Sequence, residues 1–203
     1  MTLMRLGFSV IVAGFLTFPG TAVGPQAFAS TPAEGEYEDA PDFTLLDVNG
    51  EEITLSVLLE TGPVYMECWD LPCVNCIAEL DALIPVYEEL KDRGLQIIAL
   101  SVDKPADEAR VKAFVASKQW PYITVLDQQN EVKSAYGIII KPTAYLINTE
   151  SEIVYTHIGY KKGDEERIRE EFLKWLPEPP EEPDETEEAG EEESEGGEDA
   201  SGQ

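Results

Sequence analysis

A pair of cysteines separated by two residues, Cys73-Val74-Asn75-Cys76, constrains the fold of this chain more than any other feature. The pair directly follows an apolar run typical of a strand, Val64 to Trp69, and directly precedes a run with helical periodicity, Ile77 to Leu90. A strand that leads two cysteines to the start of a helix suits thiol–disulfide exchange, because the helix N-terminus favours a thiolate. The same spacing also occurs in zinc sites, so the motif alone leaves both interpretations open.

The other potential metal ligands argue against zinc. Structural zinc takes four ligands, commonly from two cysteine pairs. This chain has one further cysteine, Cys68, and a single histidine, His157. We interpret Cys68 as a small buried apolar side chain, with a third redox thiol as the alternative. His157 has no partner nearby in the sequence, and we assign it a structural role.

The charge of the chain argues against nucleic acid as a partner. The 203 residues include 41 acidic and 14 basic side chains, which gives a net charge of −27. Such a chain repels phosphate backbones and anionic membrane surfaces. The last segment, residues 178–203, is rich in Glu, Pro, Gly and Ser and contains no Lys or Arg. We expect it to be a disordered acidic tail.

The N-terminus has the pattern of an export signal. Arg5 is followed by an uncharged, largely apolar stretch, Leu6 to Phe18, and then by the A-x-A sequence Ala27-Phe28-Ala29. This pattern predicts a cleaved signal peptide over residues 1–29 and a periplasmic or other extracytoplasmic location. An uncleaved membrane anchor is the alternative. Outside the cytosol, a CxxC pair can be either a permanent disulfide or a working redox pair.

The distribution of apolar residues predicts one α/β domain over residues 41–177, after a small, polar linker over residues 30–40. Asn49-Gly50 marks a tight turn between the two strands of an N-terminal hairpin. Helices between the interior strands imply a mixed sheet covered on both faces. The predicted strands are 42–46, 52–55, 64–68, 95–102, 122–126, 143–148 and 152–158, and the predicted helices are 74–90, 107–118, 131–136 and 164–175.

Over roughly residues 40–176 the chain resembles the TlpA/ResA-type thioredoxin-like proteins, which are exported thiol–disulfide oxidoreductases. The resemblance rests on Pro41-Asp42-Phe43-Thr44-Leu45, on the hairpin turn, on the strand that leads into the CxxC, and on Lys141-Pro142-Thr143 at the start of a later strand. It implies a thioredoxin-like fold with an N-terminal β-hairpin, and an enzyme that exchanges disulfides with proteins.

The resemblance also implies roles for particular residues. Cys73 matches the nucleophilic cysteine and Cys76 the resolving one, so a redox-active disulfide takes the place of any bound cofactor. Pro142 matches a cis proline that packs against the disulfide and leaves the adjacent backbone free to pair with a substrate. Glu67 matches a buried acid beneath the motif, and Glu79 a glutamate near the active site.

Three of the site residues, Glu67, Glu79 and Lys141, also have simpler interpretations. In an apolar strand, the carboxyl of Glu67 is desolvated and can accept the proton of Cys76, although strand alternation also allows an exposed glutamate there. Glu79 equally fits an exposed helix carboxylate. Lys141 tunes the nucleophilic thiol if it lies beside the loop, and otherwise faces solvent. Trp69 is expected to pack beside the loop, at the substrate-binding surface.

Several positions depart from the family pattern. Pro72 stands where a tryptophan usually precedes the first cysteine, and Cys68 stands where a phenylalanine is usual. Val74-Asn75 replaces a pair that commonly contains proline, and Asp81 occupies the place of a helix proline. These departures concern the redox potential and the partner-binding surface more than the activity.

The sequence thus predicts an exported, monomeric thiol–disulfide oxidoreductase that reduces protein disulfides. The resemblance implies substrates such as the haem-attachment cysteines of an apocytochrome c or a cysteine pair of a copper-site protein, with a membrane thiol reductant as electron donor. One alternative is a peroxiredoxin-like thiol peroxidase, although Asp70 occupies the position of its usual threonine. Another is a non-enzymatic copper- or protein-binding module that uses all three cysteines.

Overall fold

The computed structural model describes residues 37–178. The predicted signal peptide, most of the predicted linker and the acidic tail beyond Glu178 lie outside these residues. Within the described part of the chain, no helix is both long enough and apolar enough to span a membrane.

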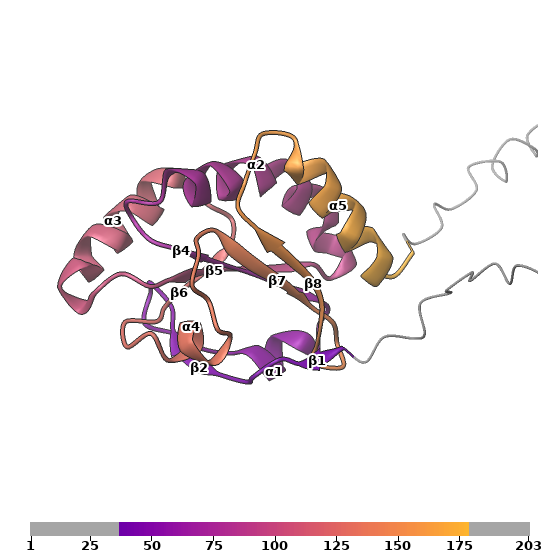
Figure 1. Cartoon of the computed structure of the whole chain (residues 1–203), viewed down its shortest axis with the longest axis horizontal. Coiled ribbons are helices and arrows are strands. Elements are labelled where there is room, and N and C mark those ends of the chain that lie inside the picture. Colours follow the sequence, from indigo (N-terminus) through magenta and orange to yellow (C-terminus); the bar gives the residue numbers. More distant parts are fainter. Residues whose placement is uncertain (1–36, 179–203) are drawn as a thin grey trace, which may run out of the picture. The chain divides into compact units, whose positions relative to one another are not determined.

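A mixed sheet of six strands forms the centre of the domain (Figure 1), with the order β1-β8-β7-β4-β5-β6. Strands β4, β5 and β6 are parallel, whereas β7 runs antiparallel to both β4 and β8, and β1 is antiparallel to β8. This confirms the predicted mixed sheet. The strands are β1 (Glu38–Asp39), β4 (Val64–Trp69), β5 (Gln96–Ser101), β6 (Ile123–Leu126), β7 (Thr143–Ile147) and β8 (Glu152–Ile158).

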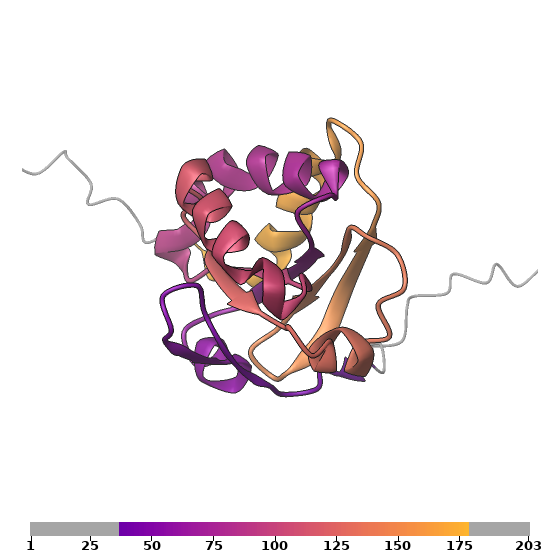
Figure 2. The ribbon, with the colours of Figure 1, turned by 90° about the vertical axis from the view of Figure 1, so that its left-hand side faces the viewer.

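Helices and a hairpin cover the two faces of the sheet, as Figures 1 and 2 show from two directions. One face carries the long helices, and the other carries the short helices together with the hairpin. The first group is α2 (Val74–Leu90), α3 (Glu108–Lys118) and α5 (Asp164–Trp175). The second is β2 (Thr44–Leu46), β3 (Glu52–Thr54), α1 (Leu55–Leu59) and α4 (Glu131–Ala135).

Strand β4 lies in the middle of this arrangement and is buried at every position. Alternate side chains enter different cores: Tyr65 and Trp69 pack with α2, α3 and α5, whereas Met66 and Cys68 pack on the other side with α1 and α4. Because side chains alternate along a strand, Glu67 faces α2 together with Tyr65 and Trp69. A charged residue in β4 is therefore buried whichever face it takes.

The N-terminal hairpin forms as the sequence predicts. Gly50 adopts a φ of 89°, a conformation that glycine tolerates best, in the turn between β2 and β3. The carboxylate of Asp47 accepts hydrogen bonds from the backbone amides of Asn49 and Glu51, both at 2.8 Å, and so satisfies the turn. Two short connecting turns of 3-10 helix, Lys91–Arg93 and Pro105–Asp107, complete the chain between the larger elements.

Two elements differ from the prediction. Strand β1 lies inside the predicted linker and pairs with β8, where Glu38 is opposite Ile153. Leu55, expected at the end of a strand, instead begins helix α1, whose Leu55 and Leu59 are buried against the sheet. Both elements are too short to show a clear period in the sequence, and tertiary contacts stabilise them.

Candidate active site

The two cysteines of the CxxC motif form a disulfide at the N-terminus of α2. Cys73 is the N-cap residue, and its Sγ accepts a hydrogen bond from the backbone N–H of Cys76 at 3.2 Å. Cys73 is partly exposed, whereas Cys76 is fully buried, with its Sγ 3.7 Å from the backbone oxygen of Cys68. An incoming sulfur atom can therefore reach Cys73 but not Cys76.

The position of Cys73 also favours its thiolate once the disulfide is reduced. The first N–H groups of a helix have no partners within the helix, and they point toward the N-cap side chain. Together with the helix dipole, these groups stabilise a negative charge on the Cys73 sulfur. The same dipole acts less on Cys76, which lies within the helix and in an apolar core.

Pro142 lies beside this motif, at the start of β7. The Lys141–Pro142 peptide bond is cis, as predicted. Pairing of Thr143 with Cys68 in the sheet brings the Lys141–Pro142 segment next to the end of β4, from which the active-site loop departs. The backbone oxygen of Pro142 accepts a hydrogen bond from Gly159 at 2.8 Å, which ties the segment to the end of β8.

The loop between β4 and α2 is held by charged side chains from two neighbouring strand ends. Lys141 forms an ion pair with Asp70, three residues before Cys73. Asp103, after β5, accepts the backbone N–H of Leu71 at 3.2 Å and the hydroxyl of Ser101 at 3.0 Å. Lys141 thus lies beside the loop and does not extend freely into solvent.

Glu67 is completely buried on the α2 side of β4, which excludes the alternative of an exposed strand glutamate. Neither of its carboxyl oxygens has a hydrogen-bond partner among the described residues. Burial, and secondarily the charge of Glu79, raises the pKa of Glu67 well above its ordinary value. Burial thus makes the carboxylate of Glu67 a stronger base than an exposed glutamate, able to exchange a proton with a neighbouring group.

Glu79 enters the same core from α2 and is also completely buried. The hydroxyl of Tyr65 donates a hydrogen bond of 2.8 Å to Oε1 of Glu79. Burial raises the pKa of Glu79 to about 7, although the hydrogen bond from Tyr65 opposes the shift. Glu79 follows Cys76 by about one helical turn, so the core on the α2 side of β4 contains two titratable carboxyls, one from the strand and one from the helix.

His157, which the sequence left without a partner, belongs to this buried polar group. Its Nε2 lies 3.8 Å from Oε2 of Glu79 and 3.9 Å from Oδ2 of Asp164. Burial lowers the pKa of His157. The contact joins β8 to α2, two segments far apart in the chain, so a pattern within either segment could not have revealed it.

The structure corrects the interpretation of Trp69. Its indole is completely buried against Phe114 and Trp120, with ring centroids 5.8 and 5.0 Å away. Trp69 therefore supports the loop from inside and does not form part of the exposed substrate-binding surface.

Cys68 is the free cysteine of the described chain and is buried. Burial raises the pKa of its thiol to about 12, so it remains protonated at neutral pH. Its side chain packs in the core that contains α1 and α4, whereas Cys76 packs in the opposite core. The three sulfur atoms therefore do not converge on one soft metal site, and Cys68 acts as an apolar core residue.

Exposed apolar side chains surround the partly exposed sulfur. Val74 follows Cys73, and Ile139 and Ile140 precede the cis proline segment; all three are exposed. Ile158, also exposed, pairs with Thr143 at the end of β8. On the other side of the loop, a cleft of about 410 Å³ extends from Asp70, Leu71 and Pro72 to the beginning of α3. Exposed apolar side chains and a cleft thus flank the loop that leads to the disulfide.

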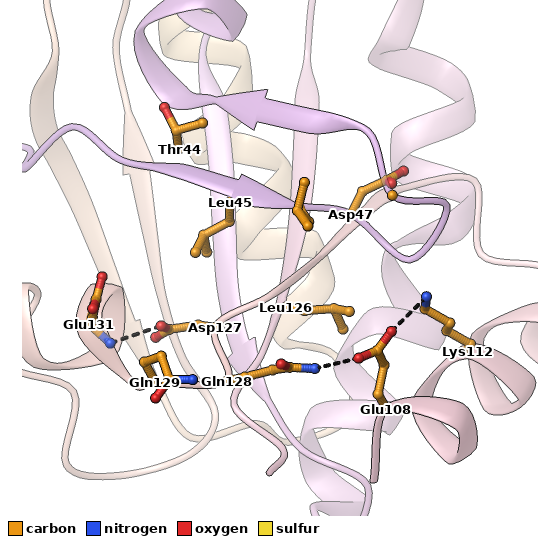
Figure 3. A pocket seen from close by; sticks show the side chains of 12 residues that line it. Thr44, Leu45, Asp47, Glu108, Lys112, Leu126, Asp127, Gln128, Gln129 and Glu131 are labelled. Atoms are coloured by element: carbon orange, nitrogen blue, oxygen red, sulfur yellow. Dashed lines mark hydrogen bonds and ion pairs between the residues drawn. The ribbon is translucent and has the colours of Figure 1, made fainter. Parts of the chain in front are cut away.

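A second hollow lies between the hairpin, α3 and the segment that leads into α4 (Figure 3). Several of its charged groups are already paired. Asp127 accepts the backbone N–H groups of Glu131 and Lys133 at 2.8 Å, and Glu108 contacts both Gln128 and Lys112. These bonds shape the turn and the start of the helices.

Comparison with known proteins agrees with this geometry. A model of the AhpC/TSA family matches residues 37–156. The thiol-disulfide oxidoreductase ResA of Halalkalibacterium halodurans is 33% identical over 173 residues, which cover 85% of this chain and 93% of the relative. ResA of Bacillus subtilis is 33% identical over 140 residues, with 69% and 76% coverage.

A solved structure shares the fold at lower identity. StoA from Bacillus subtilis matches with a TM-score of 0.55 and 23% identity, and the match covers 64% of this chain and 96% of that one. The family match, the ResA relatives and the CxxC at the N-terminus of α2 agree with one another. The chain belongs to the AhpC/TSA family and, within it, to the ResA-type thiol–disulfide oxidoreductases.

Proposed function

We propose that this protein is exported and reduces disulfide bonds in other extracytoplasmic proteins by two successive thiol–disulfide exchanges. The observation that carries the proposal is the asymmetry of the motif. Cys73 is partly exposed at the helix N-terminus, whereas Cys76 is buried above two carboxyls with raised pKa values. One sulfur is thus suited to attack a partner and the other to complete the reaction inside the protein.

In the first step, the thiolate of reduced Cys73 attacks one sulfur of the partner disulfide. A bond forms between Cys73 and that sulfur, the partner's disulfide breaks, and its second sulfur leaves as a thiolate that takes a proton from water. The apolar rim of Val74, Ile139 and Ile140 supports this step because it can cover the partner's chain around the cysteine. The backbone beside Pro142 offers hydrogen bonds to an extended segment.

In the second step, Cys76 gives its proton to the carboxylate of Glu67 and attacks the sulfur of Cys73. The Cys73–Cys76 disulfide forms, and the remaining partner sulfur leaves as a thiolate. Two electrons pass from the Cys73–Cys76 dithiol to the partner, and the protein returns to the oxidised form. The burial of Glu67 supports this role, since a desolvated carboxylate is a stronger base than an exposed one. Glu79 serves as the second proton site.

The substrate we propose is a protein with two cysteines in an extended, accessible segment, such as a haem-attachment pair of an apocytochrome c or a copper-site pair. A membrane thiol reductant then restores the dithiol. Support comes from the kinship with ResA proteins and from the export pattern of the N-terminal sequence. The absence of a permanent charge on the rim formed by Val74, Ile139 and Ile140 favours a partner segment with apolar neighbours.

A thiol peroxidase on the same fold is the competing activity. Asp70 occupies the place of the threonine that assists peroxide binding in such enzymes, and its carboxylate is engaged by Lys141. An anionic group at that position disfavours a hydroperoxide, whose reduction releases negative charge.

A direct comparison of two substrates tests the proposal. The reduced protein is mixed either with an oxidised peptide that carries a CxxCH pair or with hydrogen peroxide, and thiol loss is followed over time. We expect rapid oxidation by the peptide, together with formation of the peptide dithiol, and slow oxidation by peroxide. Fast peroxide turnover with an unreactive peptide would instead establish the peroxidase.

A further inference from the structure

His157 and Glu79 face each other, and each has one buried polar atom without a hydrogen-bond partner in the described chain. Oε2 of Glu79 and Nε2 of His157 both lack a hydrogen-bond partner within residues 37–178, and they lie 3.8 Å apart. A buried polar atom without a partner destabilises the folded state. A shift of less than about 1 Å would bring the two atoms within hydrogen-bond distance and satisfy both.

The sheet register brings these two side chains together. Glu67 pairs with Ala144 in β7, and Ala144 pairs with His157 in β8. Paired residues point to the same face, so Glu67 and His157 flank Ala144 on the face that α2 covers. The small side chain of Ala144 leaves space between them, and Glu79 enters from α2 beside His157.

The surroundings of His157 fix which nitrogen carries the proton. Nδ1 lies 3.4 Å from a guanidinium nitrogen of Arg167 and 3.5 Å from the hydroxyl of Tyr155. A guanidinium can only donate, so Nδ1 is the acceptor in the neutral ring. Nε2 then carries the hydrogen and points toward Glu79 and Asp164.

We propose that His157 is a positioning residue of the redox centre, which donates its Nε2–H to ionised Glu79 and thereby stabilises the charged form of this carboxyl. The inference rests on the proposed function, because it concerns the group that exchanges protons beneath the cysteines. Tyr65 already donates to the other oxygen of Glu79, so His157 completes the set of donors for the carboxylate.

The charged and polar neighbours of Glu79 are consistent with this role, because some raise its pKa and others lower it. Asp164 of α5 raises the pKa of Glu79, and the charge of Glu79 raises that of Glu67 in β4. Asp164 thus opposes ionisation of Glu79, and ionised Glu79 in turn opposes that of Glu67. The hydrogen bonds from Tyr65 and His157 counter the effect of Asp164, since a donor to a carboxylate stabilises its charged form. Arg167 of α5 keeps His157 in the donating tautomer.

Infrared titration of Glu79 tests the proposal in the full-length oxidised protein. The band of the protonated carboxyl that Glu79→Gln abolishes is followed against pH in the native protein, in His157→Leu and in His157→Gln. We expect the midpoint to rise by about one pH unit in His157→Leu, which removes the donor. Gln supplies an N–H but does not titrate in this range, so His157→Gln should restore most of the native midpoint.

Thr156→Val is the matched control, because Thr156 precedes His157 on β8 and is exposed. It should leave the midpoint unchanged. An unchanged midpoint in His157→Leu would overturn the proposal, and so would an equal rise in His157→Gln. If His157→Leu does not fold, comparison of His157→Gln with the native protein still decides, because a rise of one unit there excludes donation as the cause.

A second readout links the titration to the reaction. In the mixed disulfide of Cys73, the pH at which resolution reaches half its maximal rate should shift in the same direction as the infrared midpoint. The infrared titration requires neither a partner nor turnover. It therefore tests His157 even if the native protein fails to reduce the CxxCH peptide, a result that would contradict the proposed function alone.

Discussion

At the scale of single residues, the three cysteines differ in reactivity because the fold exposes each of them to a different extent. Cys73 and Cys76 share a disulfide, but only the first is accessible to a partner. Cys68 lies in the strand just before them, and it is unreactive because β4 turns it into the opposite core. The roles of Cys73 and Cys76 came from the family resemblance and stay predictions, whereas the burial of Cys68 was predicted from the sequence and is confirmed.

Contacts between residues of distant segments could not be predicted from local sequence patterns. The burial of Glu67 followed from its apolar strand, but its lack of any hydrogen-bond partner in the described chain depends on α2 and β7 together. His157 was assigned a structural role because its neighbours, Glu79 and Asp164, come from two other elements. Such pairings depend on the three-dimensional arrangement of the sheet and are not visible in a periodic pattern.

Glu79 makes stability depend on pH. The folded pKa of about 7 lies above that of a glutamate in an unfolded chain, so the folded state holds its proton more tightly. The contribution of Glu79 to the free energy of unfolding is fully present below the pKa that Glu79 has in the unfolded chain. It is lost as the pH rises through about 7, and the loss amounts to about 3 kcal/mol. We expect the free energy of unfolding of the oxidised protein, measured in urea, to fall by at least this amount from about pH 4 to about pH 8.

Glu79→Gln should flatten part of this dependence, because a neutral amide retains the contact with Tyr65 and has no proton to lose. Glu88→Gln on the exposed side of the same helix serves as the control and should keep the native slope. A native slope in Glu79→Gln would show that this carboxyl is not the titrating group.

Glu67 is expected to act on the second exchange and not on the first. In Glu67→Gln, the mixed disulfide between Cys73 and a peptide should form at the native rate, but its resolution near pH 7 should slow by about tenfold or more. Rapid quenching with acid, followed by mass spectrometry of the intermediate, measures both steps. Equal slowing of both steps would mean that Glu67 supports the site structurally and does not accept the proton of Cys76.

At the scale of elements, three strand ends and one helix start build the site. Strand β4 leads into the loop, β5 provides Asp103 beneath it, and β7 begins with the Lys141–Pro142 segment beside it. The sequence predicted α2 with its observed bounds, because a long helix has a clear apolar period. Strand β1 and helix α1 escaped prediction, because two and five residues are too few for such a pattern.

The ion pair between Lys141 and Asp70 connects β7 to the active-site loop and should tune the nucleophile. In Lys141→Met, the carboxylate of Asp70 loses its partner near Cys73, so the thiol pKa of Cys73 should rise by about half a unit to one unit. The pH dependence of iodoacetamide alkylation of the reduced protein measures this pKa.

The reciprocal variant provides the control for this prediction. Asp70→Asn should lower the pKa of Cys73, because the positive charge of Lys141 remains, and the double variant should return it near the native value. If Lys141→Met and Asp70→Asn shift the pKa in the same direction, a change of loop structure and not charge is responsible.

At the scale of the whole molecule, the described domain begins earlier than the sequence indicated. The predicted boundary at residue 41 excludes β1, which pairs with β8, and Ala40, whose N–H donates to Ser151 at 2.7 Å. A chain that starts at Tyr37 should be more stable in urea than one that starts at Pro41. The expected difference is about 1–3 kcal/mol for the lost backbone bonds. Equal stability of the two chains would show that β1 contributes nothing to the fold.

The central claim is that Cys73 attacks a protein disulfide and Cys76 releases the product. Its most direct test is to mix reduced Cys76→Ser and reduced Cys73→Ser with the same oxidised CxxCH peptide and to map the resulting adducts by mass spectrometry. We predict that Cys76→Ser accumulates a stable mixed disulfide at Cys73, whereas Cys73→Ser, whose remaining motif sulfur is buried, remains unmodified. Adducts at Cys76 in Cys73→Ser, formed as fast as those at Cys73 in the other variant, would contradict this account.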